Sequence, residues 1–135
     1  MDKYKFLEHT ADIKFKAYGK NLEKIFENVA LAISDILSRS GEVGDKSWKD
    51  IEIEGKDNES ILYDFIDDLI YLLDAENFLV SRAKVKIING KLKARVFGDD
   101  ALRYPDLDHI KAATYAEMYV KKVKDVWEAQ VVVDV

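Results

Sequence analysis

The stretch KVKIINGKLKAR, residues 84–95, carries the strongest local signal for the fold of this chain. Its Asn89-Gly90 pair, between two alternating apolar and polar runs, is typical of a β-hairpin with a two-residue turn. Such a turn pairs Ile88 with Lys91, so apolar side chains lie on one face of the hairpin and cations on the other. The cations of this predicted basic face are Lys84, Lys86, Lys93 and Arg95.

The basic face needs a source of negative charge, because like charges directly opposite each other on paired strands are destabilising. Acidic side chains on a flanking strand can supply that charge, and so can a bound partner. We prefer the first interpretation, a solvated face that is neutralised within the sheet.

On the N-terminal side of the hairpin, the periodicity predicts strands over residues 3–6 and 12–18 and a helix over 22–37. Asn21 is a suitable N-cap for this helix. A strand over residues 48–54 and a second helix over 61–73 follow, with Asp57 or Asn58 as the cap. We interpret four acids of the second helix as an ordinary solvated face: Asp64, Asp67, Asp68 and Asp74.

On the C-terminal side, residues 98–108 are predicted to form a loop. Residues 109–123 have some helical spacing but many β-branched and aromatic side chains, and we predict a long strand. A turn at 124–125 then leads to a final strand over 126–134. Strands mostly in hairpins, together with two helices, predict the α+β class. We expect a single domain over residues 1–135, in two layers, with two helices covering a mixed or antiparallel sheet.

The composition excludes several classes of function. The 135 residues include no cysteine and two histidines, so disulfides, thiolate zinc sites and cysteine nucleophiles are excluded. A formal net charge of −5 disfavours nucleic-acid binding through overall charge. Neither a bilayer-spanning apolar run of ~20 residues nor a signal peptide is present, so we expect a cytoplasmic protein without membrane contact. Phosphate-binding glycine loops, nucleophile elbows and His-Glu-x-x-His motifs are absent too, which argues against an enzyme.

Two acidic segments lie where the pattern otherwise predicts core strands. EHTADI, residues 8–13, joins the first two strands, and VVVDV, residues 131–135, ends the last one. A loop Asp is usually a turn residue, and a penultimate Asp usually belongs to a frayed tail. If the last strand is ordered beside the second, however, Asp12, Asp134 and the α-carboxylate of Val135 converge. Oxygen ligands of this kind favour Ca²⁺ or Mg²⁺.

Three motifs resemble those of the archease family, small proteins that assist the tRNA-splicing RNA ligase RtcB. They are HTADI at residues 9–13, KAATY at 111–115, and WEA at 127–129 leading to VVDV at 132–135. The resemblance implies a metal site, often with calcium, that uses Asp12, Asp134 and Val135. It also implies a functional lysine at Lys111. Many relatives have His after the Thr-Tyr pair, and Ala116 stands there in this chain, so no role of that histidine is carried over.

By resemblance, the function is non-catalytic activation of RtcB, by promoting guanylylation of the ligase's active-site histidine and thereby repeated turnover in tRNA splicing. tRNA and GTP are expected to be reached only through the ligase. His9 is a further candidate functional residue, against the alternative of a hydrogen-bonded loop histidine. Two other functions remain open. A metal-dependent phosphate-ester hydrolase is disfavoured by the few catalytic groups, and a general chaperone by the well-buried apolar pattern.

Overall fold

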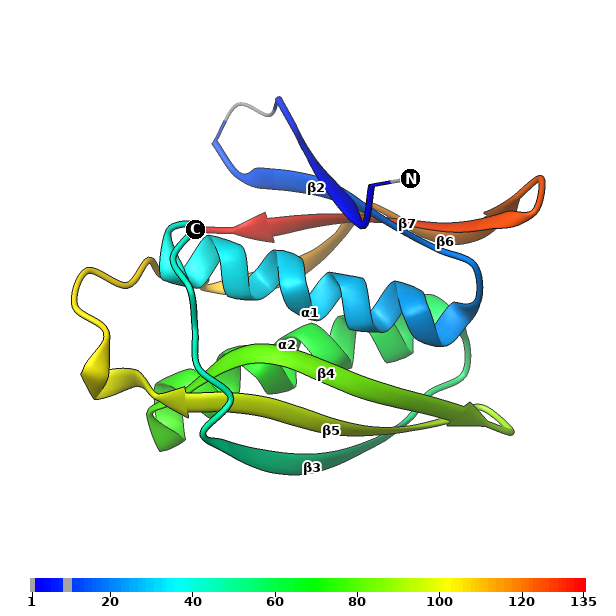
Figure 1. The fold of residues 1–135 in the computed structure, drawn as a ribbon. Coiled ribbons are helices and arrows are strands. Elements are labelled where there is room, and N and C mark those ends of the chain that lie inside the picture. The colour runs from blue at the N-terminus through cyan, green and yellow to red at the C-terminus, as the bar shows by residue number, and fades with distance from the viewer. Residues whose placement is uncertain (1, 9–10) are drawn as a thin grey trace.

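A computed structural model describes residues 2–8 and 11–135 (Figure 1). Within these residues the chain forms seven strands, two α-helices and one short 3-10 helix. In chain order they are β1 (Tyr4–Leu7), β2 (Ile13–Gly19), α1 (Leu22–Ser38), β3 (Ser47–Glu54), α2 (Asn58–Glu76), β4 (Phe78–Ile88), β5 (Lys91–Asp100), η1 (Ala101–Arg103), β6 (Ala112–Val123) and β7 (Val126–Asp134).

The strands form two antiparallel sheets, and both helices lie between them (Figure 1). The larger sheet has the strand order β1-β2-β7-β6, and the smaller sheet has the order β3-β5-β4. α1 packs against β4 of the smaller sheet and β2 of the larger one, and α2 packs against β6 and β4. The predicted α+β class, the antiparallel pairing and the two helices are confirmed.

The expected arrangement of one sheet in two layers differs from this structure, and α1 shows why. Asn28, Val29 and Ala30 are all buried, although consecutive helical residues point about 100° apart. A helix that is buried around so much of its circumference needs protein on two sides. The second sheet provides the additional contact.

The hairpin over residues 84–95 has the predicted register, with Ile88 opposite Lys91 and a turn of two residues with positive φ, Asn89 at 52° and Gly90 at 75°. Its strands extend beyond the predicted ones, since β4 begins at Phe78 and β5 ends at Asp100. The loop predicted from residue 98 therefore begins later. At Gly98 a Cβ atom would lie 2.1 Å from the backbone oxygen of Leu79, so no larger residue fits there.

Both helices begin at predicted caps. The Asn21 side chain accepts a hydrogen bond from the backbone N–H of Lys24 at 2.9 Å. Of the two residues predicted to cap the second helix, Asp57 does so, by accepting from the backbone N–H of Ser60 at 2.8 Å. Within the described residues, neither helix has an apolar stretch long enough to cross a membrane.

The ambiguous residues 109–123 form a strand over most of their length, as predicted, and β6 and β7 are joined by a turn at residues 124–125. The pairing of β6 with β7 is irregular between Thr114 and Tyr119. Glu117 in this segment has a φ of 57°, and its backbone oxygen accepts a 2.8 Å hydrogen bond from the Gln130 side chain. A side-chain hydrogen bond from β7 therefore holds the backbone of the irregular segment.

Candidate functional site

The candidate site lies at the end of the larger sheet where β2 begins and β7 ends. Ile13 of β2 stands opposite Val133 of β7, so Asp12 precedes one paired residue and Asp134 follows the other. In antiparallel strands, facing residues lie about 4.5–5.5 Å apart between Cα atoms. The pairing of the last strand with the strand opened by Ile13 therefore places both aspartates at this end of the sheet, each next to the last pair.

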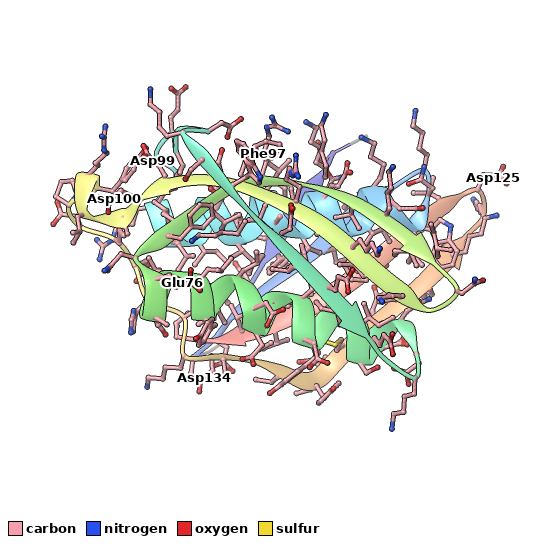
Figure 2. All side chains as sticks on the ribbon, turned by 90° about the horizontal axis from the view of Figure 1, so that it is seen from below. Glu76, Phe97, Asp99, Asp100, Asp125 and Asp134 are labelled. Carbon is pink, nitrogen blue, oxygen red and sulfur yellow. The ribbon has the colours of Figure 1, made fainter. Side chains whose placement is uncertain are left out.

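The residues at the start of β6 and just before it lie at the same end of the sheet. The backbone N–H of Lys111 donates a 2.7 Å hydrogen bond to the backbone oxygen of Asp134, and Ala112 stands opposite Asp134. Asp12 and Asp134 are partly exposed, whereas Lys111 is exposed. Figure 2 shows Asp134 at the opposite end of the molecule from Asp125, which lies in the β6–β7 turn.

The C-terminal segment is held in the sheet and is not a frayed tail. Val131, Val132 and Val133 are buried, and β7 is paired with β2 on one side and with β6 on the other. Asp134 follows directly, and Val135 is 37% exposed. The buried valines thus fix the backbone that presents Asp134 and the α-carboxylate of Val135 to solvent.

The donors at this end of the sheet suit a hard cation. Asp12, Asp134 and the Val135 carboxylate offer only oxygen atoms, the ligands that Ca²⁺ and Mg²⁺ prefer. In the part of the chain that the structure describes, no group of three or more His, Asp or Glu side chains is placed to hold a metal ion. A complete coordination sphere therefore needs the α-carboxylate, backbone oxygens or water besides the two aspartates. His9, the other predicted functional residue, lies outside the described residues.

A second group of acids lies on α2 and faces β3. Asp64, Asp67 and Asp68 line a shallow hollow of about 290 Å³ together with Glu52 and Glu54. Burial raises the pKa of the Asp68 carboxyl, and the charges of Asp67 and Asp64 raise it further. These acids repel one another, and our interpretation of them as a solvated helix face is unchanged.

The surroundings of the irregular segment in β6 could not be predicted from the sequence. The Tyr115 ring stacks on Tyr63 of α2, with 4.3 Å between centroids and 7° between planes. Thr114 Oγ1 is buried and has no hydrogen-bond partner among the described residues. The Lys14 ammonium contacts Glu117 at 2.9 Å. The KAATY motif marks this segment in the sequence, but these contacts join distant elements and leave no local pattern.

Comparison with known proteins places this architecture in one family. Residues 4–135 match the model of the archease protein family (MTH1598/TM1083). The chain is 39% identical to protein archease of Pyrococcus furiosus, with both chains covered completely, and 36% identical to that of Methanosarcina acetivorans, covering 98% of this chain and 96% of the relative.

Two solved structures have the same fold. The solution structure of Methanobacterium thermoautotrophicum protein 1598 has a TM-score of 0.85 and 32% identity, with both chains covered completely. The crystal structure of a Thermotoga maritima protein described as an archease, possible chaperone, has a TM-score of 0.67 and 22% identity, covering 96% of this chain and 94% of that one. The second likeness shows the fold alone, whereas the family model and the full-length relatives show more: this chain belongs to the archease protein family.

Proposed function

We propose that this chain is a non-catalytic activator of the tRNA-splicing RNA ligase RtcB, acting in the cytoplasm. In this proposal it promotes guanylylation of the ligase's active-site histidine and so permits repeated turnover. The observation that carries the proposal is the meeting of Asp12, Asp134 and Lys111 at one end of the larger sheet. Two carboxylates and an exposed ammonium group at one edge suit contact with a triphosphate and its counter-ion.

Each residue has a separate task in this proposal. Asp12, Asp134 and the Val135 carboxylate would hold a divalent cation, which when bound neutralises the negative charge that develops in nucleotidyl transfer. Lys111 supplies a flexible point charge that contacts phosphate oxygens. The backbone hydrogen bond from Lys111 to Asp134 fixes the position of the Lys111 backbone relative to the carboxylates, while its side chain stays exposed. tRNA and GTP stay bound to the ligase.

A ligation assay with RNA in large excess over RtcB tests this proposal. Product should exceed the amount of ligase only when this protein is added. Lys111→Ala should lower the rate of ligase guanylylation about 100-fold, the size of effect seen when a single stabilising charge contact is removed from a transition state. Its stability should change by less than about 0.5 kcal/mol because the side chain is exposed.

Lys122→Ala is the matched control, because Lys122 is an exposed lysine near the far end of β6, whereas Lys111 lies just before the start of that strand. It should activate the ligase as the unaltered protein does. Full activation by Lys111→Ala would refute the phosphate contact, and full activation by Asp12→Ala would refute the role of the metal site.

A general chaperone is the alternative function, the role that the description of the Thermotoga maritima protein names as possible for that protein. The large apolar side chains that this chain exposes come from several elements, for example Phe6 of β1, Tyr71 of α2 and Leu102 of η1. A chaperone would suppress aggregation of an unrelated heated enzyme at substoichiometric amounts, whereas a ligase activator would not. A phosphate-ester hydrolase would release phosphate from a simple aryl phosphate with Mg²⁺ and without any ligase.

A further inference from the structure

The smaller sheet turns one face to the helices and leaves the other face open, and we call the latter the outer face (Figures 1 and 2). Directly opposite residues of antiparallel strands share a face, so the register gives its composition. Three rows run across β3, β5 and β4: Trp48, Phe97 and Arg82; Asp50, Arg95 and Lys84; Glu52, Lys93 and Lys86.

The acids of β3 neutralise part of the outer face, as the sequence analysis preferred. The Arg95 guanidinium makes two hydrogen bonds to Asp50, of 2.9 and 3.1 Å, and the Lys93 ammonium lies 3.4 Å from Glu52. Lys84 and Lys86 on β4, however, are exposed and have no ion-pair partner among the described residues. The outer face thus keeps an excess of positive charge at β4, in a chain whose net charge is −5.

Two aromatic rings of the outer face lie next to its arginine side chains. Trp48 is 55% exposed and faces Phe97 across the strands. The Arg95 guanidinium lies 5.1 Å from the Trp48 ring centroid, and the Arg82 guanidinium lies 4.2 Å from that of Phe97. Cation–π contacts of exposed groups are weak. A planar ligand group can therefore stack on Trp48, the more exposed ring, and can take the place of the Arg82 guanidinium on Phe97, where Arg82 keeps its 2.7 Å ion pair with Asp45.

The positive surface continues past the edge of β4. An open groove of about 1260 Å³ is lined by cations of the outer face and by Lys20 and Lys24, at the corner between β2 and α1. Fewer acids line it, namely Asp2, Glu27, Asp50 and Glu52, and Glu27 pairs with Lys24 at 3.0 Å. A groove that begins near the aromatic rings and is lined mainly by cations suits a polymeric ligand that has both flat groups and regularly spaced negative charges. An acidic peptide would use the cations but would leave the exposed Trp48 without a function.

From this combination we propose that the outer face binds single-stranded nucleic acid, with bases stacked on Trp48 and Phe97 and phosphates on Lys84 and Lys86. Sheet faces that combine exposed aromatic rings with basic side chains bind unpaired bases by stacking, with little dependence on sequence. The binding is local and needs no overall positive charge. It is independent of ligase activation, since it belongs to the isolated protein and to a different sheet from Asp12 and Lys111.

Fluorescence anisotropy with fluorescein-labelled 12-nucleotide oligouridine and oligothymidine tests the proposal. The protein should bind both single strands and should bind a 12-base-pair RNA duplex more weakly. Trp48→Ala should weaken binding about 5- to 150-fold, the range of one lost stacking contact. Lys84→Ala/Lys86→Ala should also lower the slope of log affinity against log salt concentration by about 1.4, because each lost phosphate contact on a single strand contributes about 0.7.

The controls change the same residue types elsewhere on the surface. Tyr71→Ala removes an exposed ring of α2, and Lys5→Ala/Lys122→Ala removes two exposed lysines of the larger sheet. Both should bind as the unaltered protein does. The proposal is overturned if neither strand binds, if the control variants lose as much affinity as the test variants, or if polyglutamate of equal charge displaces the oligouridine more effectively than unlabelled oligouridine does.

Discussion

Replacing Asp12 by Asn should stabilise the protein without metal and remove its response to calcium. The register pairs Ile13 with Val133, so Asp12 precedes the last pair on one strand and Asp134 follows it on the other. Two carboxylates about 5 Å apart repel each other by roughly 0.8 kcal/mol in water and roughly 3 kcal/mol at an effective dielectric constant of 20. Both side chains are partly exposed, so Asp12→Asn should raise the free energy of unfolding by about 1–3 kcal/mol in EDTA.

Calcium should stabilise the unaltered protein and should hardly affect Asp12→Asn. At a concentration 100 times its Kd, a ligand that binds only the folded state stabilises it by about 2.7 kcal/mol. For a chain of this length, 1 kcal/mol corresponds to a Tm shift of about 3–4 °C. Calcium should therefore raise the Tm of the unaltered protein by about 9 °C and that of Asp12→Asn hardly at all.

Thermal unfolding followed by circular dichroism, in EDTA and over a calcium titration, measures both effects. Asp125→Asn is the control, because it removes an Asp at the opposite end of the molecule (Figure 2). It should leave the calcium response unchanged. A lower Tm of Asp12→Asn in EDTA, together with an unaltered shift on adding calcium, would refute the idea that the two aspartates repel each other and share an ion.

Three further predictions concern single positions. Adding Gly-Ser after Val135 should weaken calcium binding in titration calorimetry and leave the Tm in EDTA unchanged; equal affinities would mean that the carboxylate is not a ligand. Asp68→Asn should raise stability at pH 7 by about 0.2–0.5 kcal/mol, because it removes a partly buried carboxylate that Asp67 and Asp64 repel. Because the pKa of Asp68 is raised in the folded state, its ionised carboxylate destabilises the protein. This effect is absent below the ordinary pKa of 3.8 and develops as the pH rises through the higher folded-state pKa. Urea unfolding that shows the same gain at pH 3 would contradict this cause. Thr114→Val should raise the free energy of unfolding by up to about 1 kcal/mol, since it replaces a buried hydroxyl without a partner among the described residues by a methyl group, and a loss in the same urea measurement would show that the hydroxyl is hydrogen-bonded.

Local signals in the sequence were sufficient for most elements. Asn89-Gly90 fixes the turn and the register of its hairpin because both residues adopt positive φ readily. The β-branched and aromatic residues of 112–123 outweigh their partly helical spacing. In both regions the deciding interaction lies within a few residues along the chain.

The second sheet could not be predicted, because polar residues interrupt the apolar pattern on the second buried face of α1. Asn28 and Ser34 are only 9% and 7% exposed. The Asn28 side chain donates a 2.6 Å hydrogen bond to the backbone oxygen of Tyr18, which makes its burial acceptable. At the start of β4 the bulge between Val80 and Arg82 interrupts the alternation, so these residues gave no strand signal.

The two proposed functional surfaces differ in what the sequence reveals. The valines before Asp134 indicated an ordered last strand, and its pairing with β2 then followed from the fold. The role of Lys111 was predicted only from the family motif, and its position beside Asp134 is known from the structure alone, because their backbone hydrogen bond links the residue before β6 to the end of β7. The hairpin cations were visible in the sequence, whereas the place of Trp48 beside Phe97 depends on the pairing of β3 with β5.

A crystal structure of the protein grown with calcium tests most directly whether Asp12 and Asp134 share one cation beside Lys111. We predict a single ion with oxygens of both aspartates and of the Val135 carboxylate within about 2.3–2.6 Å, the calcium–oxygen range. Saturating calcium that leaves the two side chains without a common ion, or that binds only among the acids of α2, would contradict the proposed site.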